Sequence, residues 1–139
     1  MRLNLKVKAK TQWDMARRIL IKDASIWVAN RLDLRPLPIN VQVRLVGDYG
    51  TEYGSVARPY DDDYFVVWIH AGRSVSRTVK TVFHEFTHIF QYCYEGLVMD
   101  SGENPALFRG DEYRTEYWES PWEKEARRSE RKLYKEWRR

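Results

Sequence analysis

The sequence predicts a single α+β domain in which a small, mostly antiparallel sheet packs against helices. Several segments alternate apolar and polar residues, the period of a half-buried strand. Three longer segments repeat apolar residues every three to four positions, the period of an amphipathic helix. The length of 139 residues supports one core, so residues 1–139 are expected to form one domain.

The N-terminal part predicts a strand, a helix and a second strand. Apolar residues alternate with polar ones over Leu3–Ala9, which predicts a half-buried strand. Residues 11–32 then carry the helical period, and two prolines within Leu34–Pro38 end that helix. The alternation returns over Ile39–Leu45 and predicts the second strand.

The middle of the chain predicts two more strands and a long helix. Gly54–Tyr60 is expected to be a short edge strand, because Pro59 is disfavoured in a central position. The continuous apolar run Phe65–Ile69 predicts a strand buried on both faces. Ser74–Glu95 has helical apolar spacing, with neither Gly nor Pro inside it.

The C-terminal part predicts a loop region and a last helix. Residues 96–119 are mostly loop, with a small hairpin expected over Leu107–Tyr113. Ser120 suits the N-cap of a helix and Pro121 suits its first position. One apolar stripe of this helix should face the core: Trp122, Ala126, Ser129, Leu133 and Trp137.

An HExxH motif, His84-Glu85-Phe86-Thr87-His88, lies inside the long central helix. Residues four apart share a helix face about 6 Å apart along the axis, so two imidazoles can bind one zinc ion. Glu85 lies roughly 100° around the helix from His84, where it can act on a water without ligating the metal. The motif predicts a zinc site with His84 and His88 as ligands and Glu85 as general base.

A catalytic zinc generally takes three protein ligands. No histidine follows His88, so the third ligand is expected to be a carboxylate. Glu123 is favoured over Glu125 because it lies nearer the apolar stripe of the last helix, although both stay open. A competing role for Glu123 is a capping box with Ser120. His70 precedes the motif and is interpreted as a strand-end histidine rather than as a ligand.

The motif, followed by Glu123-Lys124-Glu125-Ala126 on a second helix, resembles the small Glu-zincin metallopeptidases. The likeness is greatest to compact members often encoded by phages or prophages, and more distant to the ImmA/IrrE group. Those proteins have HExxH and then Glu-x-x-Ala at the start of a later helix. Phe108–Tyr113, Tyr117 and Pro121–Glu123 also fit the phage-type proteins, so the resemblance covers roughly residues 65–130.

This resemblance implies a minimal zincin-like fold, zinc on His84, His88 and Glu123, and Glu85 as the base in peptide-bond hydrolysis. Several such families place Asn or Asp four residues after the ligand Glu, where it supports a histidine. Here that position is Arg127, so the chain departs from the pattern of those families at a residue that would support a ligand histidine.

Other parts of a peptidase site can be assigned only as candidates. A second donor to the developing oxyanion is usual in such sites, and Tyr113, Arg114 and Tyr117 are candidates. The strand Phe65–Ile69 is expected to lie along the cleft, where a peptide could bind extended against a sheet edge. A non-catalytic zinc-binding or scaffold protein remains the alternative within the zinc class.

The excess positive charge lies at the C-terminal end. Residues 120–139 hold eight Lys or Arg and four Glu, a net of +4 that equals the net charge of the whole chain. The preferred interpretation is a solvated helix face, with Glu123 paired to Arg127 and Glu130 bridging Arg127 and Arg131. The expected partner is a protein or peptide substrate, and a nucleic acid bound by this helix is the less favoured alternative.

No targeting or membrane segment is expected. Residues 1–8 contain no apolar h-region, and no run approaches the roughly 18 apolar residues of a membrane span. The one cysteine, Cys93, permits no internal disulfide and is interpreted as a packing residue. A reducing cytoplasm is therefore the expected location.

Overall fold

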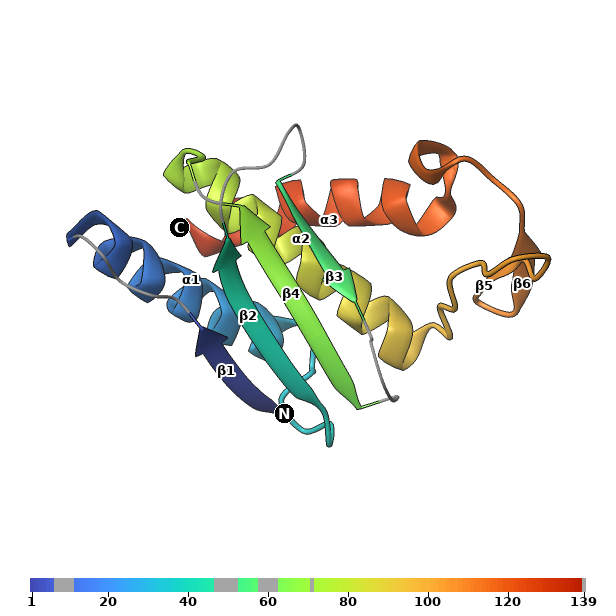
Figure 1. The fold of residues 1–139 in the computed structure, drawn as a ribbon, viewed down its shortest axis with the longest axis horizontal. Coiled ribbons are helices and arrows are strands. Elements are labelled where there is room, and N and C mark those ends of the chain that lie inside the picture. The colour runs from blue at the N-terminus through green and yellow to red at the C-terminus, as the bar shows by residue number, and fades with distance from the viewer. Residues whose placement is uncertain (7–11, 47–52, 58–62, 71, 139) are drawn as a thin grey trace.

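The computed structural model describes residues 1–6, 12–46, 53–57, 63–70 and 72–138. Within these ranges the chain forms a four-stranded sheet, a two-stranded hairpin and three α-helices (Figure 1). The predicted α+β class is confirmed. None of the helices in the described ranges is both long enough and apolar enough to cross a membrane.

The first three elements follow the predicted order. They are β1 (Arg2–Lys6), α1 (Gln12–Arg31) and β2 (Asn40–Val46). β1 alternates exposed and half-buried residues, as its sequence period predicts. The chain returns through α1 before it enters β2, so β1 and β2 pair in parallel. The last part of the predicted first strand, residues 7–9, lies outside the described residues.

The next two strands set the topology of the sheet. β3 (Gly54–Ala57) pairs with β4 (Tyr64–His70) in antiparallel orientation, and β4 pairs with β2 in parallel. The strand order is β1-β2-β4-β3, which leaves β3 at an edge. The main sheet is therefore mostly parallel, and the expectation of a mostly antiparallel sheet was wrong for it. Apolar periodicity locates a strand, but the path of the connection decides its direction.

The helices α2 (Val75–Tyr94) and α3 (Pro121–Trp137) complete the helical layer, which lies behind the sheet in Figure 1. α2 is central, because it contacts α1, α3, β3 and β4. Ser74 caps its N-terminus by accepting a hydrogen bond from the Arg77 amide. Cys93 packs at the margin of the main core, as predicted. The fully buried residues of that core include Val43, Phe65, Val67, Ile69, Val82, Phe83 and Phe86.

A second, smaller core lies under the segment that joins α2 to α3. β5 (Ala106–Phe108) and β6 (Asp111–Tyr113) form the hairpin predicted there, and the short helix η1 (Tyr117–Glu119) follows. The rings of Phe108 and Tyr113 each lie 5.9 Å from the ring of Trp122, in the first turn of α3. This packing fixes where α3 begins relative to the end of α2.

Candidate metal centre

α3 packs against the face of α2 that carries the HExxH motif. The hydroxyls of Thr87 on α2 and Ser129 on α3 lie 3.1 Å apart. Ala126, fully buried, lies on the same face of α3 as Ser129 and is small enough to permit a close approach of the helices. This packing places the first turn of α3 beside His84 and His88.

Three buried ligand groups converge at this contact. Nε2 of His84 lies 2.7 Å from Oε1 of Glu123, and Nε2 of His88 lies 3.0 Å from Oε2 of the same carboxylate. The chosen ligand atoms of His84, His88 and Glu123 all lie within 4.8 Å of one another. Atoms that share a tetrahedral zinc at about 2.1 Å lie roughly 3.4 Å apart, so small adjustments suffice to hold one ion.

The second nitrogen of each imidazole faces a hydrogen-bond acceptor. Nδ1 of His84 lies 3.2 Å from Oε2 of Glu130, and Nδ1 of His88 lies 2.7 Å from Oε1 of Gln91. The amide of Gln91 is oriented by its own hydrogen bond from Nε2 to the Trp122 carbonyl, at 2.9 Å. Each Nδ1 therefore donates to its acceptor, and in a neutral imidazole the lone pair of Nε2 would point at Glu123.

This arrangement requires a cation. In the neutral tautomers two nitrogen lone pairs face a carboxylate that is only 2% exposed, and no hydrogen lies between them. Apart from Nε2 of His88, no group among the described residues lies in position to donate a hydrogen bond to Oε2 of Glu123. Buried acceptors that face one another are unstable without a proton or a metal ion to share. Two imidazoles and one carboxylate are a donor set of catalytic zinc.

Without a metal, a proton takes this place. Burial lowers the pKa of His84, but its hydrogen bonds with Glu123 and Glu130 outweigh that effect and raise the pKa to about 10. Burial raises the pKa of Glu123, whereas hydrogen bonds from the two histidines hold it well below its usual range. Both shifts share one cause, the contact of the histidines with Glu123.

Glu85 lies in the same cleft as the three ligand groups and is 6% exposed. Its burial raises the pKa of its carboxyl, and the positive charges of His88 and His84 partly offset that rise. Gly54, at the start of β3, packs close to this turn of α2. A Cβ at Gly54 would lie 3.6 Å from Cγ of Glu85 and only 2.6 Å from Cγ2 of Thr81.

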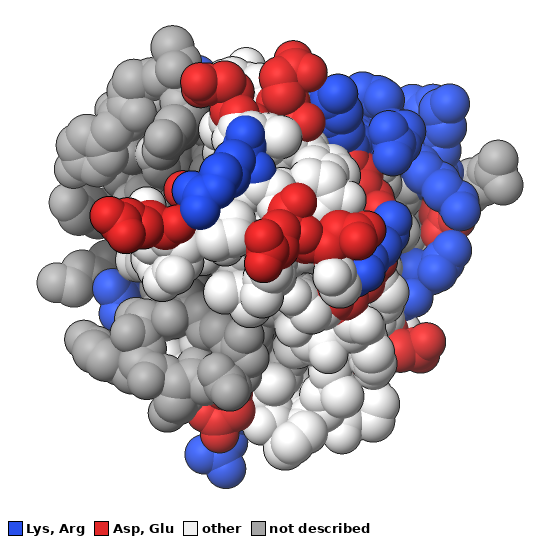
Figure 2. All heavy atoms as spheres, turned by 90° about the vertical axis from the view of Figure 1, so that its right-hand side faces the viewer, with Lys and Arg blue, Asp and Glu red and all other residues white. Residues whose placement is uncertain are grey.

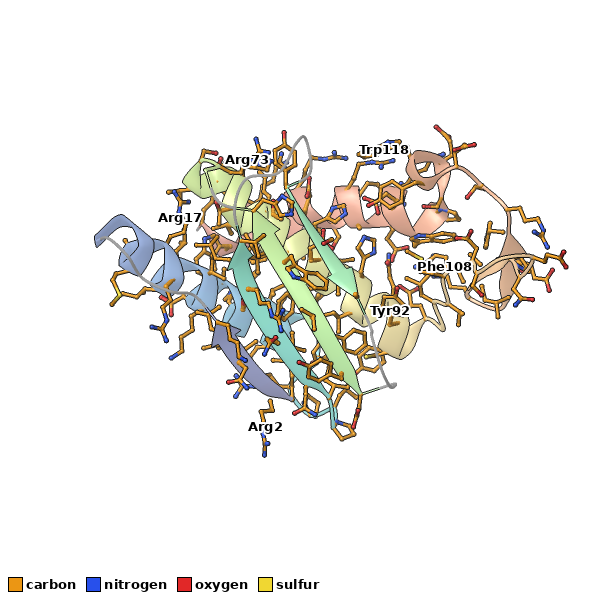
Figure 3. The ribbon with its side chains drawn as sticks, viewed as in Figure 1. Arg2, Arg17, Arg73, Tyr92, Phe108 and Trp118 are labelled. Atoms are coloured by element: carbon orange, nitrogen blue, oxygen red, sulfur yellow. The ribbon has the colours of Figure 1, made fainter. Side chains whose placement is uncertain are left out.

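The cleft above these residues has a volume of about 620 Å³ and is bordered by α2, β3, η1 and α3. Figure 3 labels two of its aromatic residues, Tyr92 from α2 and Trp118 from η1. Trp118 is 65% exposed, so it lines the cleft without being held in a core. Further lining residues are Tyr53, Ser55, Val56, Met99, Tyr117 and Arg127.

The structure separates the two candidates for the third ligand. Glu123 faces both histidines, whereas the carboxylate of Glu125 pairs with Arg109 away from them. The competing capping box is not formed. Ser120 is the N-cap, but its amide and its hydroxyl both donate to the carbonyl of Tyr117 and not to Glu123. His70 ends β4 and is not part of the ligand group.

Of the three candidates for the oxyanion donor, only Tyr117 lines the cleft. Tyr113 packs on Trp122, and Arg114 donates to the carbonyl of Glu103. The expectation that Phe65–Ile69 lies along the cleft was wrong. β4 is an inner strand between β2 and β3, so the edge strand β3 takes that place.

The residues that support the histidines were not predicted from the sequence. Glu130 follows Glu123 by seven residues, two helical turns, and so lies on the same face of α3. Gln91 follows His88 by three residues on the same face of α2. Their spacing from Glu123 and from His88 on the same helix was the signal that could have identified both residues. That signal is weak, because many polar residues have such a spacing by chance.

Comparisons of this chain with protein-family models, with curated proteins and with solved structures find no match. Its function therefore has to be argued from the geometry of the site.

Proposed function

We propose that this protein is a zinc-dependent metallopeptidase that hydrolyses peptide bonds, with Glu85 as its general base. One observation carries the proposal. Nε2 of His84, Nε2 of His88 and the carboxylate of Glu123 converge in a buried site, and Glu85 lies in the same cleft. A zincin-like fold and catalysis are part of the same proposal.

His84, His88 and Glu123 would hold the metal, and Glu130 and Gln91 would keep the imidazoles in the tautomer that binds it. When bound in such a site, zinc acts as a Lewis acid and lowers the pKa of a coordinated water to about 7. Only three protein ligands are gathered in the described residues, which leaves a position for that water.

Glu85 supplies the proton transfer. Its carboxyl has a raised pKa, so it is a better proton acceptor than an exposed glutamate. It would take a proton from the attacking water and deliver it to the nitrogen of the leaving amine. Its burial keeps bulk water from competing for that proton.

An extended peptide would bind along β3. Gly54, Ser55 and Val56 of this edge strand line the cleft, and an edge strand can pair with a peptide backbone. Tyr117 and Trp118 on the opposite border are exposed and offer apolar surface to side chains of the substrate. The bound segment would therefore be a flexible stretch of chain, because only such a stretch can adopt the extended form.

We place the activity in a reducing compartment such as the cytoplasm. The chain has one cysteine and builds its cores without a disulfide among its own residues.

Zinc stoichiometry tests the proposal. We expect one zinc per chain by elemental analysis in wild type and in Glu125→Ala, and a loss of zinc in Glu123→Ala. Glu125→Ala is the matched control, because it removes a carboxylate two residues away that faces Arg109 instead. Absence of zinc from wild type after refolding with added metal, or its retention in Glu123→Ala, would contradict the ligand set.

A further inference from the structure

The outward face of α3 carries a stripe of basic residues. Consecutive members are four or three residues apart, so they lie on one side of the helix over about 21 Å. All of them are exposed: Lys124, Arg128, Arg131, Lys135 and Arg138, with Lys132 beside them. We call these six residues the basic stripe.

The four glutamates of α3 do not neutralise the basic stripe, because each is directed to a partner on another element. Glu123 contacts the two histidines, Glu125 contacts Arg109, Glu130 contacts His84 and Arg77, and Glu136 contacts Arg31. The predicted pairing of Glu123 with Arg127, and the predicted bridge from Glu130 to Arg127 and Arg131, were therefore wrong. The residues that build the metal centre leave the outer face of the helix with positive charge alone.

Few other groups balance this charge. Lys124 has an exposed ion pair with Glu119 at 3.2 Å, which contributes little to neutralisation in water. Among the described residues, the side chains of Arg128, Arg131, Lys132 and Lys135 form no hydrogen bond or ion pair. Figure 2 shows Lys and Arg side chains gathered at the upper right of the face drawn, with acidic side chains nearer its centre.

We propose that the basic stripe binds the phosphate backbone of a nucleic acid, independently of base sequence. Each strand of duplex DNA carries one phosphate per 3.4 Å of axis, so about six lie along 21 Å of one strand. Because the strand winds around the axis, a straight helix can contact about four of them. α3 contains neither Asn nor Gln, the side chains that read adenine. Its Arg and Lys side chains can contact guanine as well as phosphate, so binding to two duplexes of unrelated sequence distinguishes the two kinds of contact. Contacts with phosphate position a protein without selecting a sequence.

An anionic membrane is the less suitable polyanion. A helix that lies on a membrane inserts an apolar face between the headgroups. The apolar face of α3 is already occupied, because Trp122, Ala126 and Leu133 are buried in the protein. The outer face carries cationic side chains and no apolar side chain that could insert between headgroups. Such a face is suited to a phosphate backbone rather than to a membrane.

The basic stripe and the cleft are used on different sides of α3. Glu123 faces α2, whereas the basic stripe faces solvent, so a bound nucleic acid would leave the cleft accessible. The inference does not depend on peptidase activity. The Glu85→Gln protein should bind nucleic acid as wild type does, whether or not wild type proves to be a peptidase.

The test is the salt dependence of binding to a fluorescent duplex of mixed sequence, between about 25 and 200 mM NaCl. With about four phosphate contacts, the slope of log K against log salt should be about −3.6 for wild type. Changing Arg128, Arg131 and Lys135 together to Gln should reduce the size of the slope by about 2.7. The single change Arg131→Gln should reduce it by about 0.9, and it guards against a folding defect in the triple variant.

The matched control removes three exposed cations elsewhere, by the changes Arg18→Gln, Lys22→Gln and Arg35→Gln. It should keep the slope of wild type, and a second duplex of unrelated sequence should bind equally well. The proposal is overturned if wild type does not bind at the lowest salt, or if the control loses as much slope as the stripe variant. Tighter binding to vesicles with phosphatidylserine than to duplex would also overturn it.

Discussion

Nδ1 of His84, on α2, donates a hydrogen bond of 3.2 Å to Oε2 of Glu130, on α3. Glu130 lies two helical turns after Glu123 on the same helix. The other oxygen of Glu130 lies 3.4 Å from Nη1 of Arg77. Glu130 supports His84 from this position, whereas Arg127, four residues after Glu123, borders the cleft.

Glu130→Ala should therefore weaken zinc binding without removing a ligand. Loss of a carboxylate that orients a ligand histidine typically costs 10- to 100-fold in metal affinity, and we expect about that loss here. Competition with a chromogenic chelator measures it. Glu130→Gln keeps an acceptor and should lose less, whereas equal affinity in wild type and Glu130→Ala would contradict the supporting role.

Glu85→Gln should keep its zinc and lose its activity. Removing the base while retaining the ligands should slow hydrolysis by about 10²- to 10⁴-fold. Because the substrate has to be found, a mixture of peptides is incubated with each protein, and products are identified by mass spectrometry. Peptides cut by wild type and spared by the variant report the activity. Equal cleavage by a zinc-loaded Glu85→Gln protein would disprove the mechanism.

The zinc-free protein should lose stability as pH rises above neutrality. The pKa of His84 is about 10 in the folded chain, against about 6.5 when unfolded, so its protonation stabilises the fold fully below 6.5. The free energy of unfolding should fall by a few kcal/mol, in order of magnitude, between about pH 6.5 and pH 10.

Urea unfolding of chelator-treated protein across that pH range checks this prediction. His84→Gln removes the titrating group and should flatten the dependence. A zinc-free wild type whose stability is constant or rises over the same range would show that no proton bridges the histidine and Glu123.

Gly54→Ala should disturb the contact between β3 and α2. The new Cβ would meet Cγ2 of Thr81 at 2.6 Å and the backbone oxygen of Trp68 at 2.7 Å, so the strand must move. Overpacking of this kind typically costs about 1–3 kcal/mol. Thermal unfolding measures the loss, with Ser55→Ala as the neighbouring control. Adding Thr81→Ser should restore little, because the contact with the backbone oxygen remains.

Trp118→Ala should affect substrate binding more than turnover. Trp118 lines the cleft and is 65% exposed, so its removal leaves both cores intact. Loss of one aromatic contact of about 0.5–1.5 kcal/mol should raise KM by roughly 2- to 12-fold with kcat nearly unchanged. Met15→Ala, at an exposed apolar residue outside the cleft, should leave KM unchanged. A fall in kcat with constant KM would assign Trp118 another role.

Much of the fold could be predicted because its signals are local. The period of apolar residues located α1, α2 and α3 to within a few residues, and the HExxH run placed three site residues on one helix. Ser120 and Pro121 indicated where α3 begins, and the structure confirms that start. These features depend on neighbours in sequence, which is why one chain is sufficient to predict them.

The remaining features depend on packing between distant segments. β4 returns between β2 and β3, and nothing in its apolar run indicates that position or its direction. Whether Glu123 or Glu125 faces the histidines depends on the rotation of α3 about its own axis. The packing of Trp122 in the second core sets that rotation. The partners of Glu130 likewise follow from that rotation, and so does the uncompensated charge on the outer face.

Between His88 and Glu123 the chain leaves α2, forms the hairpin and η1, and returns to start α3. An ion bound by both residues would join the two ends of this segment, as a covalent cross-link would. It would thereby restrict the conformations of the segment in the unfolded chain. Its removal should loosen the smaller core around Trp122 before the sheet. Amide exchange would then become faster in β5, β6 and the first turns of α3, while β2 and β4 stay protected. The supply of metal would therefore control the local stability of the border of the cleft that α3 forms.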